Sequence, residues 1–283
     1  MTEAVEVHQD NRRVYYHRHS AVVRVTHWVN VLCMTVLLLS GLQIFNAHPA
    51  LYWGQISTFE DPALAMRAVR QGDGTARGVT EVFDTQFGTT GFLGLSAGEG
   101  GEMVPRGFPS WLTLPSYQDL ATGRRWHFFF AWAFVINGLV YLLYTFFTGH
   151  WRQLVPTGGQ FRGIGHSIRE HIVLRFPKGE EAKVYNVLQK IAYFLVIFVV
   201  VPVLILAGLN MSPGMNAQFP WLLDLFGGRQ SSRTIHFIAA FLILAFVFVH
   251  IALVLVSGVW NNMRSMVTGN YRIEEEEVRH AAE

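Results

Sequence analysis

Four long intervals without a charged residue constrain this sequence more than any other feature. Their boundaries are Arg24 and Glu60, Arg125 and Arg152, Lys190 and Asp224, and Arg233 and Arg264. A helix needs about 20 apolar residues to cross a hydrocarbon core of roughly 30 Å, and charge inside that core is costly. Because lipid offers the backbone no hydrogen bonds, isolated spans of this length must be helical. The sequence therefore predicts four membrane-spanning helices, most apolar at about 26–45, 127–147, 191–209 and 235–259.

The composition agrees with a membrane protein and excludes several other classes. Only 15% of the 283 residues are charged, whereas soluble domains contain about a quarter. The net charge of +2 is too small to hold nucleic acid by field strength. The one cysteine, Cys33, excludes an internal disulfide and a Cys-rich zinc or iron–sulfur site within the chain.

Basic residues mark two flanks of the spans. Arginines precede the first span, and seven Lys and Arg residues from Arg152 to Lys190 lie between the second and third spans. The positive-inside bias places both flanks in the cytoplasm. The first span lies more than 20 residues from Met1 and lacks a cleavage region, so it is expected to be a retained anchor. In a bacterium, this predicts a multi-pass inner-membrane protein with both termini cytoplasmic.

The expected fold is an all-α membrane protein, a bundle of four transmembrane helices. Residues 1–23 are expected to form a cytoplasmic N-terminal segment, 24–260 the membrane domain and 261–283 a cytoplasmic tail, interpreted as a solvated helix end or a frayed terminus. The membrane domain includes a periplasmic insertion at about 47–122 and a cytoplasmic loop at about 149–184. The insertion has no helical pattern and a Gly-rich run from Gly88 to Gly101. Loops this long commonly bind something or are partly disordered.

Four histidines fall within the spans or at their ends: His27, His127, His236 and His250. Ionisable residues at membrane depth indicate a functional site. His236 and His250 are 14 residues apart, nearly four turns, so they project from almost the same face about 21 Å apart along the axis. Because successive spans run in opposite directions, His27 is expected to pair with His250 on the cytoplasmic side. His127 is expected to pair with His236 on the outer side.

Two imidazoles from facing helices fit haem better than zinc. Zinc takes four ligands, or three and a water, whereas haem iron needs only two axial ligands from the protein. No CxxCH motif is present for covalent attachment, so two b-type haems are expected. Gly41 and Gly138 would let a porphyrin pass close to the backbone, or would merely pack the helices.

Arginines precede three of these histidines by two or three residues. Arg24, Arg124, Arg125 and Arg233 are therefore candidates for contacts with haem propionates, or they anchor the spans in the headgroup region. Most histidines in polar segments, together with His48 and His150, are interpreted as surface residues. Trp28, Trp126 and Trp151 are interpreted as part of an interfacial aromatic belt.

These four spans and their histidine quartet resemble the bacterial di-haem b-type cytochrome subunits. That family includes the membrane subunits of respiratory formate dehydrogenase, nickel-iron hydrogenase and thiosulfate reductase, and the resemblance covers somewhat over a third of the chain. It implies that His127 and His236 hold an outer haem, and His27 and His250 an inner one. It also implies electron exchange between a periplasmic partner and quinone near the inner haem.

The long outer segment departs from the compact formate dehydrogenase type. It is more similar to cytochromes that accompany periplasmic molybdenum oxidoreductases, so the partner is expected to be such an enzyme or an iron–sulfur protein. The segment is expected to help dock that partner, with electrons crossing inward to quinone. Spacing does not define a quinone pocket; the candidates near the inner haem are His17, His19, Arg24, Trp151 and Arg152.

Three functions remain open at this point. The first is an electron-transfer subunit, because bis-histidine iron has no open coordination site. The second is a stand-alone superoxide or ferric reductase that uses the same haems. The third is a transporter whose histidines relay protons, which the absence of Asp and Glu from the four apolar stretches disfavours.

Overall fold

Four long helices in the computed structural model match the predicted spans. The structure describes all residues except 1–8, 11–12, 157, 162–163, 173–185 and 275–283. The helices long and apolar enough to cross a membrane are Ala21–Asn46 (α1), Leu120–Thr148 (α2), Val187–Asn210 and Arg229–Val256 (α10). The chain divides into two compact units, and α1, α2 and α10 contribute residues to both. Unit 1 contains 1–28, 137–201 and 242–283, and unit 2 contains 29–136 and 202–241.

Polar caps, rather than the edge of the apolar run, determine where these helices begin. The Ser20 hydroxyl accepts a hydrogen bond from the Val23 amide before the first full turn of α1. The Asp119 carboxylate accepts the Thr122 amide at the start of α2, and hydrogen bonds from Thr122 lower the pKa of Asp119. His127 and His236 were expected to open their spans, but each lies seven residues inside its helix.

The third span is interrupted by one wide turn. It consists of Val187–Leu195 (α6), a π-helical turn Val196–Val200 (η3) and Val201–Asn210 (α7). Asn186 caps α6 in a reciprocal capping box with Gln189. Pro202 lies two residues after the end of the wide turn, and a proline inside a helix supplies no backbone N–H. The altered hydrogen-bonding pattern of η3 accommodates that missing donor.

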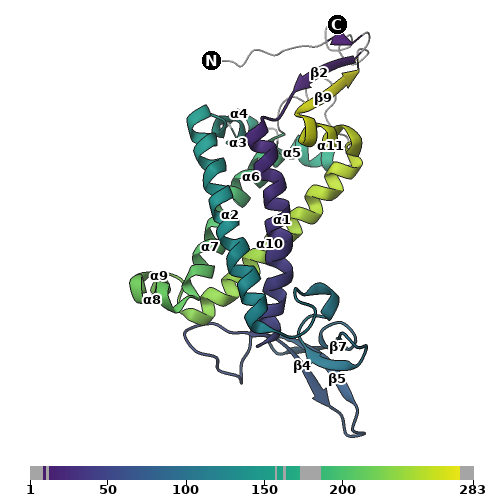
Figure 1. Ribbon diagram of the computed structural model, residues 1–283, viewed down its shortest axis with the longest axis vertical. Coiled ribbons are helices and arrows are strands. Elements are labelled where there is room, and N and C mark those ends of the chain that lie inside the picture. The colour runs from purple at the N-terminus through teal and green to yellow at the C-terminus, as the bar shows by residue number, and fades with distance from the viewer. Residues whose placement is uncertain (1–8, 11–12, 157, 162–163, 173–185, 275–283) are drawn as a thin grey trace. The chain divides into compact units, whose positions relative to one another are not determined.

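The segment between α1 and α2 contains β-structure, so the all-α expectation is wrong and the chain is only mostly helical. A four-stranded antiparallel sheet has the order Ala50–Leu51 (β3), Leu64–Arg70 (β4), Ala76–Val82 (β5) and Thr85–Gly88 (β6). Gly94–Ala97 (β7) pairs with Met103–Arg106 (β8), and β7 lies beside β4 and β5 (Figure 1). A 3-10 turn, Ser110–Leu112 (η1), follows. The strands are short, so the alternation of apolar and polar residues that marks a strand is hard to recognise in the sequence.

The middle of the Gly-rich run, residues 94–96 of β7, is buried. A Cβ on Gly78 of β5 would lie 2.5 Å from the carbonyl oxygen of Leu93, which precedes β7. The two backbones are therefore so close that only glycine fits at position 78. Arg106 is 3% exposed, and its guanidinium donates to the Phe108 and Ser116 carbonyls and to the Thr113 hydroxyl. A deletion of 88–101 would therefore remove β7 and disrupt the sheet.

The core of unit 2 joins this segment to the spans. Leu42 and Phe45 of α1 are buried with Leu51, Met66 and Phe108, and Phe237 and Phe241 of α10 pack against them. Two short helices, Pro213–Gln218 (α8) and Pro220–Leu225 (α9), connect α7 to α10. The Thr234 hydroxyl donates to the Tyr52 carbonyl, and the Gly54 amide donates to the Ser231 hydroxyl. The residues before His236 are thus fixed against the β-structured segment.

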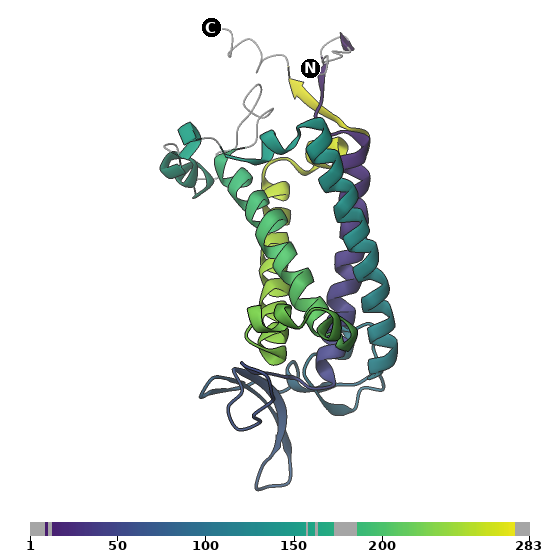
Figure 2. The same ribbon diagram turned by 90° about the vertical axis from the view of Figure 1, so that its left-hand side faces the viewer.

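Unit 1 pairs the N-terminal segment with the C-terminal tail. Arg13–His17 (β2) lies antiparallel to Asn270–Glu274 (β9), and Gln9–Asp10 (β1) pairs with β2 (Figure 1 and Figure 2). The helix Val259–Thr268 (α11) precedes β9. Three short helices follow α2: Trp151–Leu154 (α3), Gly158–Phe161 (α4) and Ile164–Ile172 (α5). Residues 261–268 of the tail therefore belong to α11 and 270–274 form a paired strand, whereas 275–283, the rest of the tail interpreted as a solvated or frayed end, lie outside the described residues.

Candidate functional site

His127 of α2 and His236 of α10 face each other in unit 2. Their ring centroids are 6.2 Å apart and their planes are inclined by 66°. His236 Nδ1 lies 2.8 Å from the Leu204 carbonyl oxygen, and His127 Nδ1 lies 3.1 Å from the Leu37 carbonyl oxygen. A carbonyl oxygen only accepts, so Nδ1 must carry the proton in both rings. In the neutral imidazole, Nε2 is then free to bind a metal.

Two glycines allow neighbouring helices to approach these rings. A Cβ on Gly41 of α1 would lie 3.3 Å from His127 Cε1, and a Cβ on Gly208 of α7 would lie 3.0 Å from His236 Cε1. Gly41 therefore approaches the imidazole itself, whereas the sequence placed it near a porphyrin. Gly208 was not identified from the sequence; the only signal was its small size within a run of large apolar residues. Gly138 has no atom within 4 Å of such a Cβ, its own helix and chain neighbours aside.

Replacing Gly208 by Ala is expected to displace the His236 ring. The added methyl would meet Cε1 at 3.0 Å and Nδ1 at 3.1 Å, closer than ordinary van der Waals contact, so the ring or α7 must shift. We expect haem retention in detergent to weaken by about fivefold to a hundredfold, consistent with overpacking costs of about 1–3 kcal/mol. Gly138→Ala is the matched control and should retain haem as the parent does. Equal retention by both variants would contradict the role of Gly208.

His27 of α1 and His250 of α10 form the corresponding pair in unit 1. Their ring centroids are 6.4 Å apart, with the planes inclined by 58°. Phe246 stacks on His250 with centroids 6.0 Å apart, and Trp28 meets the edge of His27 at 5.2 Å. His27 Nδ1 is buried without a hydrogen-bond partner among the described residues. The two pairs thus share a ring separation but differ in how the rings are held.

The donor set and the spacing in both pairs fit haem. With a metal–imidazole bond of about 2 Å and about 1 Å from nitrogen to ring centre, imidazoles on opposite sides of one metal have centroids about 6 Å apart. The observed 6.2 and 6.4 Å agree with that value. Within the described ranges, no group of three or more His, Cys, Asp and Glu side chains is arranged to hold a metal ion. Two ligands per site suit haem iron and leave zinc incompletely coordinated.

The candidate arginines occupy different environments. Arg233 donates to the Ala50 carbonyl at 2.9 Å and also to the His48 carbonyl, which fixes β3 and its approach against α10. Arg24 donates to the Val267 carbonyl, while its Nε is buried without a partner in the described part of the chain. Arg124 stacks on Phe128, and Arg125 lines a groove of about 300 Å³ with Thr122, Trp126 and Phe129. Their contacts with propionates remain predictions.

His48 was interpreted as a surface residue, but the structure places it beside Arg233. Its ring stacks on Tyr52 at a centroid distance of 5.7 Å, and Phe59 meets its edge at 5.7 Å. Burial, followed by the charge of Arg233, lowers the pKa of His48. This ring is therefore mostly neutral near pH 7. No periodic pattern in the sequence indicates its position.

The five quinone candidates lie in unit 1. His17 Nδ1 is 3.3 Å from Asn270 Oδ1 in the β2–β9 pair, and the Arg152 guanidinium lies over the Trp151 ring of α3. Burial and then the positive charge of Arg18 lower the pKa of His19 to about 4. His19 is consequently neutral at physiological pH. The assignment of these residues to a quinone remains a prediction.

Comparisons with known proteins identify a family. The family model for prokaryotic cytochrome b561 matches residues 18–269, which include all four spans and all four paired histidines. A putative protein-methionine-sulfoxide reductase subunit, YedZ1 of Azospira oryzae, is 26% identical over 240 residues. That alignment covers 84% of this chain and 90% of the relative. No solved structure matches the chain.

Proposed function

Because the chain belongs to the prokaryotic cytochrome b561 family and is a membrane haem b electron-transfer subunit, we propose that it holds two haems and links quinol to a periplasmic oxidoreductase. The observation that carries this proposal is the pair of two-imidazole sites with nearly equal ring separations. His127 and His236 would hold one haem, and His27 and His250 the other. Each haem would supply a reversible one-electron carrier, and ligation by two histidines would favour electron transfer over reaction with oxygen or substrate.

The chain's own residues orient the ligands. The Leu37 and Leu204 carbonyls hold the Nδ1 protons of His127 and His236 and aim Nε2 at the site between them. Such hydrogen bonds fix the orientation of the ring and would make it a more basic ligand. Phe246 stacks on His250, and Trp28 packs against the edge of His27. Arg24, Arg124, Arg125 and Arg233 are the proposed propionate contacts.

The relative supports a direction of electron flow. It is named a reductase subunit, and a reductase consumes electrons. We therefore place electron entry at the His27–His250 haem, from quinol on the cytoplasmic side, and exit at the His127–His236 haem. This direction is opposite to the inward transfer expected from the sequence. The partner is a periplasmic oxidoreductase, with a molybdenum enzyme acting on oxidised methionine in proteins as the first candidate.

Exposed aromatic side chains on the β-structured segment support its role in docking. Phe83, Phe87 and Trp111 are 64%, 51% and 70% exposed. Phe59 and Phe83 are non-glycine residues with positive φ angles of 57° and 48°, a conformation that is unfavourable for bulky side chains. Aromatic side chains are enriched in protein–protein interfaces. The orientation proposed for the chain, with both termini cytoplasmic in the bacterial inner membrane, places this segment in the periplasm.

A quinol added to the purified, oxidised protein tests this function. Both b haems are expected to become reduced, and addition of the oxidised periplasmic partner should reoxidise them. Superoxide or ferric iron in place of the partner should give much slower reoxidation. Failure of quinol to reduce either haem would contradict the proposed link to the quinone pool.

A further inference from the structure

α11 leaves the end of α10 through a sharp turn. α10 ends at Val256, and Gly258 has a φ of +105°, a left-handed conformation that redirects the chain before α11 begins at Val259. The outward residues of the last turns of α10 are apolar: Ile251, Leu255 and Val256 are 49%, 59% and 52% exposed. α11 therefore starts where a membrane-spanning surface ends.

The polarity of α11 is inverted relative to a helix on a soluble protein. Its inward face is polar: Ser265 is 1% exposed, and Asn261 exchanges hydrogen bonds with the Arg272 backbone at 2.7 and 2.9 Å. Asn262 donates to the Ser257 hydroxyl at 3.0 Å on the same side. Its outward face carries Trp260, Met263 and Val267, which are 84%, 39% and 60% exposed.

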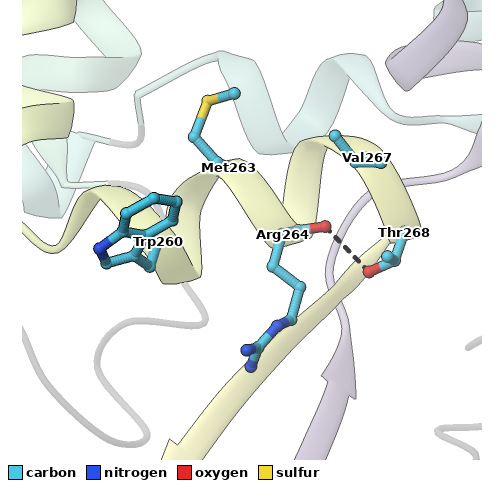
Figure 3. A pocket seen from close by; sticks show the side chains of 5 residues that line it. All are labelled: Trp260, Met263, Arg264, Val267 and Thr268. Atoms are coloured by element: carbon cyan, nitrogen blue, oxygen red, sulfur yellow. Dashed lines mark hydrogen bonds between the residues drawn. The ribbon is translucent and has the colours of Figure 1, made fainter.

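The outward residues form one stripe along the helix. Trp260, Met263, Arg264, Val267 and Thr268 follow helical spacing and line a shallow groove of about 400 Å³ (Figure 3). Arg264 is the one charged residue of α11. Its guanidinium has no hydrogen-bond or ion-pair partner within the described ranges. An apolar stripe beside an unpaired cation matches the chemistry of a phospholipid with a negative headgroup.

We propose that α11 lies in the headgroup region of the membrane and binds an anionic phospholipid. The acyl chains contact Trp260, Met263 and Val267, and the phosphate contacts Arg264. Three features favour lipid over a protein partner: the stripe continues the lipid-facing surface of α10, a tryptophan lies at the expected interfacial position, and the helix's one charge is positive. Hydrogen bonds from Trp28 and Arg24 to the Met266 and Val267 carbonyls hold α11 against α1.

Spin labels on the full chain in lipid nanodiscs test the position of α11. Single cysteines at positions 260, 263 and 267 are introduced in a Cys33→Ala background, because Cys33 is the only native cysteine. We expect each label to collide more often with lipid-soluble oxygen than with a water-soluble nickel complex. A control label at Thr75, in the exposed turn between β4 and β5, should show the reverse. More frequent collisions with the nickel complex than with oxygen at all three positions would overturn the proposal.

Replacing the charge of Arg264 tests whether α11 prefers an anionic headgroup. In nanodiscs that contain phosphatidylglycerol and phosphatidylcholine, Arg264→Gln should lower the preference of the bound lipid for phosphatidylglycerol about fivefold. Arg169→Gln removes the same charge from an exposed position on α5 and should leave that preference unchanged. An unchanged preference in Arg264→Gln, or an equal loss in both variants, would overturn the assignment of Arg264. Lipid analysis by native mass spectrometry does not depend on haem content, so its outcome is independent of the proposed electron transfer.

Discussion

Replacing His236 by Ala is expected to lower the haem content of the purified protein from two b haems per chain to one. The His127–His236 site would lose one of its two imidazoles, whereas the His27–His250 site would retain both, since it lies in the other unit. His127→Ala should give the same loss, and His250→Ala should remove the other haem. The double variant His236→Ala/His250→Ala should contain none. The measurement is the haem-to-protein ratio together with the reduced-minus-oxidised spectrum.

His150→Ala is the matched control for these variants. His150 lies near the end of α2 and contacts Tyr144, and it belongs to neither pair. It should retain both haems. Circular dichroism and gel filtration establish that each variant is folded before its haem is counted. Two haems in both His236→Ala and His250→Ala would contradict the assignment of the two histidine pairs as haem ligands.

His236→Ala is also expected to stop electron delivery to the periplasmic partner while quinol still reduces the remaining haem. The proposed path from quinol to the partner passes through the His27–His250 haem first, so removal of the second haem should break it after the first step. Partner-dependent quinol oxidation should fall to background, and rapid-mixing absorbance should show the remaining haem reduced at close to the parental rate.

The variant His250→Ala tests the order in which electrons reach the two haems. In His250→Ala, quinol should reduce the remaining haem far more slowly than in the parent, because its point of entry is lost. The reduced partner, supplied artificially, should still exchange electrons with that haem. If instead His236→Ala blocked quinol reduction and His250→Ala spared it, the proposed direction and the proposed orientation in the membrane would both be reversed.

The sequence predicted the spans and the adjacency of the histidines well. Charge-free intervals define membrane helices almost alone, because the cost of burying charge outweighs local preferences. The alternating directions of the spans then predicted that His27 lies beside His250 and His127 beside His236. The structure shows both contacts. The resemblance to bacterial b-type cytochromes is confirmed at the level of the family. The use of these histidines as haem ligands stays a prediction.

Other features depend on contacts that no periodic pattern encodes. β3 to β8 are strands of only two to seven residues, and most of the turns between them contain glycine, so the segment looked like a loop. The close approach of Gly208 to His236 depends on how α7 packs against α10. The inverted polarity of α11 was hidden because its ten residues are nearly balanced between apolar and polar side chains.

The haem-to-protein ratio of the unmodified chain tests the central claim most directly. The purified protein is converted to its pyridine haemochrome, and the haem b absorbance is divided by the protein concentration from amino-acid analysis. Two histidine pairs with ring separations of 6.2 and 6.4 Å predict a ratio of two, and two reduction steps in a potentiometric titration. A ratio of one with a single step, in fully loaded protein, would contradict the account.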